Sequence, residues 1–319
     1  MSMKMLRGFI LACGLVAAGA NAQDYPSSAV TVTVPFSPGG SNDTIARYLA
    51  DGLSKLWGQP FVIENRPGGG TALGAAHVSK SAPDGMNILF VSGSYSINAA
   101  TRADLPFKPL EDLHSVATAA TAQIAVISGP RVTIKTLEDL IREAKAQEIF
   151  YATAGVGSQQ HFFAAMLAEV LGIQMTAVPY PGGAEGLLDL LGGRVDIVVG
   201  TVSGMLATIE SGATPVAILS DERSVSLPDV PTVTEEGHPD AATATYWIVM
   251  VPDGTPPEIA EKLNRGVVEV FGSPEGTAFL ASLDARPSAH TVQESEAFIS
   301  DEISKWTAIA ERLKIRGSN

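Results

Sequence analysis

Cysteine is almost absent from this sequence. Cys13 is the only cysteine among 319 residues, and it lies in an N-terminal segment that we expect to be removed. A chain with one cysteine cannot form an internal disulfide, and without Cys13 no thiol remains to bind a metal or act as a nucleophile. The sequence therefore excludes a disulfide-stabilised fold and cysteine catalysis in the mature protein.

Basic residues are also scarce. Lysine and arginine together number 21, against 34 aspartates and glutamates, which gives a formal net charge of -13. Proteins that bind nucleic acid or anionic membrane surfaces present a basic face to the phosphates. We therefore expect neither nucleic acid nor a membrane surface as a partner.

Long hydrophobic runs are missing too. The longest apolar stretch at the N-terminus, residues 9–18, is shorter than the roughly 20 residues that span a bilayer. It follows the basic residues Lys4 and Arg7 and precedes a small-x-small cleavage site at residues 20–22. This order predicts a signal peptide over residues 1–22 and export of a soluble, monomeric mature chain to the periplasm.

Two alternatives remain for this N-terminal segment. It could stay uncleaved as a signal anchor. Alternatively, residues 10–14 resemble a lipidation box, in which Cys13 would carry the lipid. The short apolar run and the good cleavage site favour the cleaved signal peptide.

The remaining composition is that of a globular protein. Hydrophobic residues make up 45% and charged residues 17%, although aromatic residues reach only 6%. This is ample for buried cores, and the length predicts two domains of ~100–200 residues each.

Short β-branched strands alternate with helical segments along the chain. Residues 30–36 are typical of a buried strand, and residues 44–56 have the apolar spacing of a helix. The same order recurs at residues 150–153 and 159–170. The repetition predicts βαβ units with a mainly parallel sheet, and hence an α/β fold class.

Three turns share one design. Residues 37–43, 154–159 and 180–184 each follow a strand, are rich in glycine and small polar residues, and open a helix. The first N–H groups of a helix have no intrahelical partner and carry a partial positive charge, so such turns can bind an anion without lysine or arginine. We expect them to hold a carboxylate; the alternative is ordinary, well-capped loops.

Several individual residues have two interpretations. Ser41 and Asn42 could cap the first helix or contact a ligand, whereas Asp43 fits a cap better because its charge would repel a carboxylate. Tyr95 could stack on a ligand or pack in the core, and His161 could contact a ligand or be a packed structural residue. The candidate ligand-binding residues are Ser37, Pro38, Gly39, Gly40, Ser41, Asn42, Tyr95, Ala154, Gly155, Gly157, Ser158, Gln159, His161, Tyr180, Gly182, Gly200 and Thr201.

Enzyme signatures are not matched. Residues 200–204 place Ser203 one position too late for a nucleophile elbow, and residues 68–73 have Leu73 where a dinucleotide fingerprint requires glycine. The five histidines are too far apart in sequence to suggest a metal site. We therefore expect a protein that is not an enzyme and has no cofactor or metal.

A series of motifs in register covers essentially the whole mature chain. They are VPFSPGGSND at 34–43, ENRPG at 64–68, APDG at 82–85, YATAG at 151–155, VPY at 178–180, LLGGRVD at 190–196 and LPDVPT at 227–232. Together they resemble the substrate-binding proteins of tripartite tricarboxylate transporters, also called the Bordetella uptake gene family.

The resemblance implies a type II periplasmic binding protein fold, with two α/β lobes and a ligand cleft between them. Residues 23–122 and 245–319 would form the first lobe, and residues 123–244 the second. It further implies that the first two turns hold a ligand carboxylate, partly through water. The expected partner is a membrane permease with a large and a small subunit.

The sequence departs from the family pattern in two places. Pro181-Gly182-Gly183 replaces a more usual Lys-Gly. Gly200 and Thr201 stand where many relatives carry an aspartate followed by asparagine or serine. Loss of the acid removes a partner for an ammonium group and lowers repulsion toward a second carboxylate. We therefore predict a ligand without an amino group, such as an aromatic dicarboxylate like terephthalate. A ligand-presenting component for a receptor kinase, or a secreted hydrolase, are the alternative functions.

Overall fold

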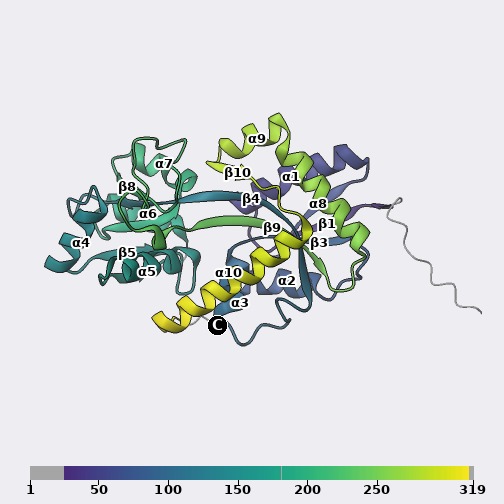
Figure 1. The fold of residues 1–319 in the computed structure, drawn as a ribbon, viewed down its shortest axis with the longest axis horizontal. Helices are drawn as coiled ribbons and strands as arrows, with labels where there is room; N and C mark the ends of the chain where they lie inside the picture. The colour runs from purple at the N-terminus through teal and green to yellow at the C-terminus, as the bar shows by residue number, and fades with distance from the viewer. Residues whose placement is uncertain (1–24, 181, 316–319) are drawn as a thin grey trace, which may run out of the picture.

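The computed structural model describes residues 25–180 and 182–315. The expected signal peptide at residues 1–22, with Cys13, lies outside these residues. The described elements gather into two lobes that are joined by two long strands, as Figure 1 shows.

The first lobe contains a parallel sheet in the order β2-β1-β3. Its N-terminal elements are β1 (Val30–Val34), α1 (Ser41–Trp57), β2 (Phe61–Asn65), η2 (Gly69–Thr71), α2 (Ala72–Val78), β3 (Asn87–Ser92) and α3 (Ser94–Thr101). The chain returns to this lobe with α8 (Pro257–Gly272), α9 (Pro274–Ala281), β10 (Ala285–Pro287) and α10 (Val292–Leu313).

The amphipathic pattern of α1 explains how the first lobe packs. Ile45, Leu49 and Leu53 recur every four residues and are fully buried against the β1 strand and α8. Such a stripe covers one face of a helix. The helix ends at Gly58, whose φ of 69° is the left-handed conformation that glycine adopts most readily at a helix end.

The second lobe repeats the alternation of strands and helices. Strands β5 and β6 pair in parallel, and β5 also pairs in parallel with β7. The elements are α4 (Leu137–Ala146), β5 (Phe150–Thr153), α5 (Gln159–Leu171), β6 (Thr176–Pro179), α6 (Gly183–Leu191), β7 (Ile197–Thr201), α7 (Val202–Glu210), β8 (Thr214–Ile218) and η3 (Pro239–Ala241).

Strands β4 (Leu113–Ser128) and β9 (Ala244–Pro252) connect the lobes. β4 pairs with β9 from Leu113 to Gln123 and then with β7 from Ile124 to Ser128. The sheet order is β2-β1-β3-β9-β4-β7-β5-β6. β4 and β9 pair antiparallel with each other because one strand leaves the first lobe and the other returns to it. The pairings of β4 and β9 with β3, β7, β8 and β10 are antiparallel as well. The expected mainly parallel sheet is therefore wrong, although the α/β class is confirmed.

Helix α10 runs along both lobes. Its Ile299 is buried with residues of β3, β4 and β9, while Trp306 is buried in the core of the second lobe. The indole of Trp306 lies 5.8 Å from the ring of Phe162 and 5.7 Å from that of Phe163, measured between ring centroids. The C-terminal half of α10 therefore packs on α5.

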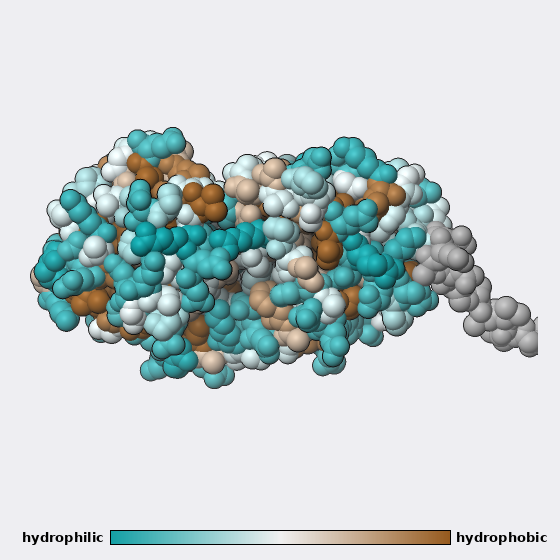
Figure 2. All heavy atoms as spheres, turned by 45° about the horizontal axis from the view of Figure 1, so that its top comes forward, coloured by the Kyte–Doolittle hydropathy of each residue, from teal (hydrophilic) through white to brown (hydrophobic). Residues whose placement is uncertain are grey.

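The surface is predominantly polar on the face that Figure 2 presents, and hydrophobic residues form small separate groups on it. Among the helices of residues 25–180 and 182–315, none combines the length and apolar character that crossing a bilayer requires.

Candidate functional site

A cavity of about 740 Å³ lies between the two lobes. Its walls come from the turns after β1 and β5, the end of β7, the turn at residues 67–71, one side of α3, and Thr245 of β9. Strands β1, β5 and β7 all present their carboxyl ends to it. This is the position where ligands bind in open α/β sheets.

The first turn leads into α1 and contributes Ser37 and Ser41 to the cavity wall. The carboxylate of Asp43 stabilises this turn through a hydrogen bond: its Oδ2 accepts the Gly39 N–H at 2.9 Å. Arg47 Nε donates to the same oxygen at 2.8 Å and is the main reason that the pKa of Asp43 is lowered to about 2. The Gly39 amide is thus already bonded within the protein.

The first amides of α1 remain unpaired. Within the described residues, the N–H groups of Ser41 and Asn42 have no hydrogen-bond partner, and the first N–H bond of the helix is from Thr44 to the Gly40 carbonyl. Unpaired amides at a helix start attract anions. The Asn42 side chain has a different role, because its Oδ1 accepts a hydrogen bond from Trp247 Nε1 at 2.8 Å.

The second turn, residues 154–158, leads into α5 and lines the cavity along its whole length. Ser158 caps the helix: its Oγ accepts the His161 N–H at 3.3 Å. This leaves the serine hydroxyl hydrogen to donate to another acceptor. In the described part of the chain the N–H groups of Gln159 and Gln160 have no partner.

His161 contacts the second turn and does not face the cavity. Its Nδ1 accepts the N–H of Gly157 at 3.1 Å, and burial lowers the pKa of the imidazole. Both effects favour the neutral ring, because a protonated Nδ1 could not accept that bond. His161 is not among the residues that line the cavity.

Gly200 and Thr201 form part of the cavity wall at the end of β7. A Cβ atom on Gly200 would lie 2.9 Å from Cε of Met205, which is closer than such atoms pack. Glycine at residue 200 therefore adds neither a side chain nor a charge to this part of the wall.

Other predicted residues lie elsewhere. The Tyr95 hydroxyl donates to the Pro109 carbonyl at 2.6 Å, and its ring is buried in the core. The Tyr180 hydroxyl donates to Asp189 Oδ2 at 2.8 Å, and Gly182 precedes α6 as its N-cap. Among the described residues, those of the third turn (180 and 182–184) do not line the cavity, and neither do Pro38, Gly39, Gly40 or Asn42.

Sequence reasoning missed one side of the cavity. Ser94, Asn98 and Arg102 lie four residues apart on α3 and at its end, and all three line the cavity beside the glycine-rich turn at 67–71. Asn98 Nδ2 donates to the carbonyls of Gly70 and Ser94. The spacing of polar residues every four positions is the signal that could have identified this wall.

The cavity is suited electrostatically to an anion. Among the described residues that line it, Arg102 is the only charged one, and none is acidic. The full sequence carries a formal net charge of -13. A wall without carboxylates in such an acidic protein removes the main repulsion that an anionic ligand would meet.

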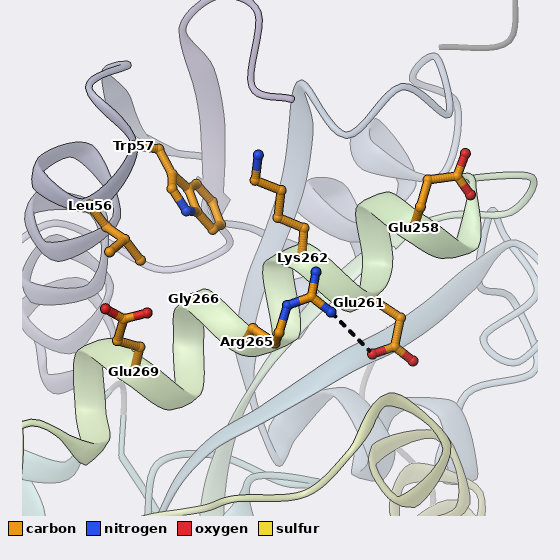
Figure 3. Close-up of a pocket in the computed structure, with 8 residues that line it drawn as sticks. All are labelled: Leu56, Trp57, Glu258, Glu261, Lys262, Arg265, Gly266 and Glu269. Carbon is orange, nitrogen blue, oxygen red and sulfur yellow. Dashed lines mark ion pairs between the residues drawn. The ribbon is translucent and has the colours of Figure 1, made fainter. Parts of the chain in front are cut away.

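A second hollow, of about 670 Å³, lies between the end of α1 and one face of α8 (Figure 3). Three of its lining residues are acidic: Glu258, Glu261 and Glu269. Arg265 pairs with Glu261 at 3.9 Å, so its charge is partly offset there. This hollow is away from the strand ends and less suited to an anion. The described residues also contain no group of three or more histidine, cysteine or acidic side chains placed to hold a metal.

The two α/β lobes and the cavity between them define a binding protein of the periplasmic type. Residues 45–315 match the family model of TctC, the tripartite tricarboxylate transporter family receptor, and the chain belongs to this family. The family consists of receptors that bind a solute, so the protein is not an enzyme and the hydrolase alternative is excluded.

Relatives of known sequence and structure match over nearly their full lengths. Protein BugT of Bordetella pertussis is 34% identical over 307 residues, which cover 95% of this chain and 94% of BugT. The structure of R. palustris Rpa4515 with adipate has a TM-score of 0.82 at 31% identity, covering 92% of this chain and 99% of that one.

Two further solved structures support the fold. MatC of Rhodopseudomonas palustris with bound malate has a TM-score of 0.77 at 28% identity, over 89% of this chain and 99% of MatC. The structure of periplasmic binding protein BugD has a TM-score of 0.79 at 25% identity, covering 92% of this chain and 100% of BugD. The predicted periplasmic binding protein fold is thereby confirmed.

Proposed function

We propose that this protein is a soluble, monomeric periplasmic binding protein, released from its signal peptide. It captures a small carboxylate between its lobes and delivers it to a tripartite tricarboxylate-type permease with a large and a small membrane subunit. The observation that carries this proposal is the cavity wall: it contains unpaired amides at the starts of two helices, and none of the described residues that line it is acidic. The adipate and malate in the structures of two relatives support the ligand class.

One carboxylate would be held where α1 and α5 begin. The donors are the N–H groups of Ser41, Gln159 and Gln160 together with the hydroxyls of Ser41 and Ser158. A hydrogen bond to a charged group contributes roughly 1.5–3 kcal/mol, about twice a neutral one. A few such bonds from both lobes would favour the closed arrangement of the lobes over the open one.

The lobes would comprise residues 23–122 with 245–319, and residues 123–244. The change of pairing partner within β4, between Gln123 and Ile124, supports a division at this point. Gln123 pairs with Ala244 at the start of β9, which supports a second crossing beside the first. Bending at these two adjacent positions would open and close the cavity.

The ligand would carry no amino group, and an aromatic dicarboxylate such as terephthalate is a candidate. Gly200 supplies room without a negative charge, and Ile124 and Phe163 add apolar surface to the wall. An ammonium group would find no carboxylate partner among the described lining residues.

A thermal-shift screen of carboxylates tests the function. The panel contains adipate, malate, terephthalate, hexanoate and benzoate, with aspartate and glutamate as amino acids of similar size. A ligand present at 100 times its Kd adds ~2.7 kcal/mol to the free energy of unfolding. We expect stabilisation by carboxylates without an amino group; stabilisation by the amino acids alone would contradict the proposal.

A further inference from the structure

Arg102 is the one charged side chain among the described residues that line the cavity. Its side chain is only 11% exposed, although Asp104, its acidic partner, is 53% exposed. The guanidinium donates from Nε and Nη2 to the two carboxylate oxygens of Asp104, at 3.0 and 2.9 Å. Nη1 donates to the Gly69 carbonyl at 2.8 Å, which fixes the guanidinium at the cavity rim.

These bonds leave donors for a ligand. A guanidinium has five N–H groups in one plane, and the three bonds described use three of them. Asp104 offsets part of the charge of Arg102, but water and salt screen this effect because Asp104 is more than half exposed. Arg102 therefore keeps two N–H donors and part of its attraction for an anion.

The position of Arg102 is set by α3. Ser94 begins this helix beside the start of α5: a side chain on the preceding Gly93 would come within 2.7 Å of Gln159 Nε2. Arg102 follows Ser94 by eight residues, or about 12 Å along a helix axis at 1.5 Å per residue. The cavity thus has helix-start amides near one end of α3 and a cation near the other.

We propose that Arg102 binds the second carboxylate of a dicarboxylate ligand, and so makes the protein selective for dicarboxylates over monocarboxylates. The inference rests on the proposed function, in which the first carboxylate is held where α1 and α5 begin. A monocarboxylate of equal length satisfies the first group of donors only. A dicarboxylate spans the cavity and pairs with the cation as well.

Calorimetric titration of the mature protein with adipate and hexanoate tests this inference, because the two ligands have the same chain length and differ in one carboxylate. The unmodified protein is expected to bind adipate at least tenfold more tightly. Arg102→Gln is expected to lower adipate affinity by about tenfold or more, the range for a charge-assisted hydrogen bond, and to leave hexanoate affinity within about twofold.

Asp104→Asn is the matched control, since it removes the acidic partner of Arg102 and keeps the guanidinium. We expect this variant to bind adipate as tightly as the unmodified protein, or more tightly. If Arg102 serves only to hold the turn at Gly69, Arg102→Gln will weaken adipate and hexanoate equally, which overturns the inference.

Further outcomes separate this inference from the proposed function. If the unmodified protein binds adipate and hexanoate equally, the proposed function stands but the inference about Arg102 is overturned. If it binds no carboxylate, both the proposed function and the inference are overturned. Should Arg102→Gln unfold, as shown by circular dichroism, Arg102→Lys keeps a cation with different geometry. A lower ratio of adipate to hexanoate affinity in that variant supports the inference, and an unchanged ratio overturns it.

Discussion

Gln159 donates a hydrogen bond from Nε2 to Oγ1 of Thr245 at 3.2 Å. This bond joins the start of α5 in the second lobe to the beginning of β9, where the chain returns to the first lobe. Both residues line the cavity. The contact therefore couples the relative position of the lobes to the place where we propose that the ligand carboxylate binds.

Gln159→Ala should weaken carboxylate binding without unfolding the protein. The variant removes one neutral hydrogen bond, worth about 0.5–1.5 kcal/mol, but keeps the Gln159 N–H that we assign to the ligand. Calorimetry should show adipate affinity reduced by about two- to tenfold. Gln147→Ala, at the end of α4 and away from the cavity, is the control. Equal losses in both variants would indicate a general effect on folding.

Replacement of Gly200 separates charge from size. Gly200→Asp and Gly200→Asn introduce side chains of nearly equal shape beside Met205 and the cavity, but only the aspartate adds a negative charge. We expect the aspartate variant to bind dicarboxylates at least about tenfold more weakly than the asparagine variant, because like charges repel in a cavity partly screened from water. Equal dicarboxylate affinities in the two variants would show that the size of the side chain at residue 200, and not its charge, determines the affinity.

Asp43 should make the free energy of unfolding depend on pH in the acidic range. Its pKa in the folded protein, about 2, lies below the ordinary value of 3.8, chiefly because of Arg47. The ionised form is therefore favoured by folding, and its contribution is present above pH ~4 and lost as the pH falls toward 2. Urea unfolding at several pH values should show this loss, and Asp43→Asn should reduce it.

The matched control for the acid effect is Asp51→Asn. Asp51 lies on the same helix and pairs with Lys55, but both side chains are mostly exposed. Exposed pairs of this kind contribute little. A pH dependence that persists in Asp43→Asn and disappears in Asp51→Asn would contradict the assignment.

Trp306→Ala should destabilise the protein strongly. The indole is 1% exposed and packs on Phe162 and Phe163. Removal of a buried aromatic side chain typically costs about 3–5 kcal/mol. Urea unfolding should show this loss, while Trp306→Phe should retain a substantial part of the stability. An alanine variant as stable as the original would mean that α10 does not depend on this contact.

The elements that the sequence predicts well are those with local signals. The strand, turn and helix within residues 30–56 and 150–171 follow from apolar spacing and from helix-capping residues, which act within a few positions. For the same reason the turn at residues 154–159 was predicted correctly as a helix start. Whether its residues contact a ligand stays a prediction.

The elements that the sequence did not reveal depend on contacts far along the chain. Helix α3 begins with Ser94, Tyr95 and Ser96, which carry no clear helical pattern, so the sequence does not predict the wall that ends at Arg102. The pairing of β4 with β9 joins residues more than 100 positions apart. Tertiary packing, which no local pattern encodes, decides both.

Helix α10 limits how far the lobes can separate. Ile299 is buried on the first lobe and Trp306 on the second, seven residues later, which is about 10 Å along one continuous helix. A helix hardly stretches or bends over such a length. The lobes can rotate about α10. Direct separation of the lobes would expose either Ile299 or Trp306 to water, so we expect the lobes to move by twisting rather than by a simple widening of the cavity.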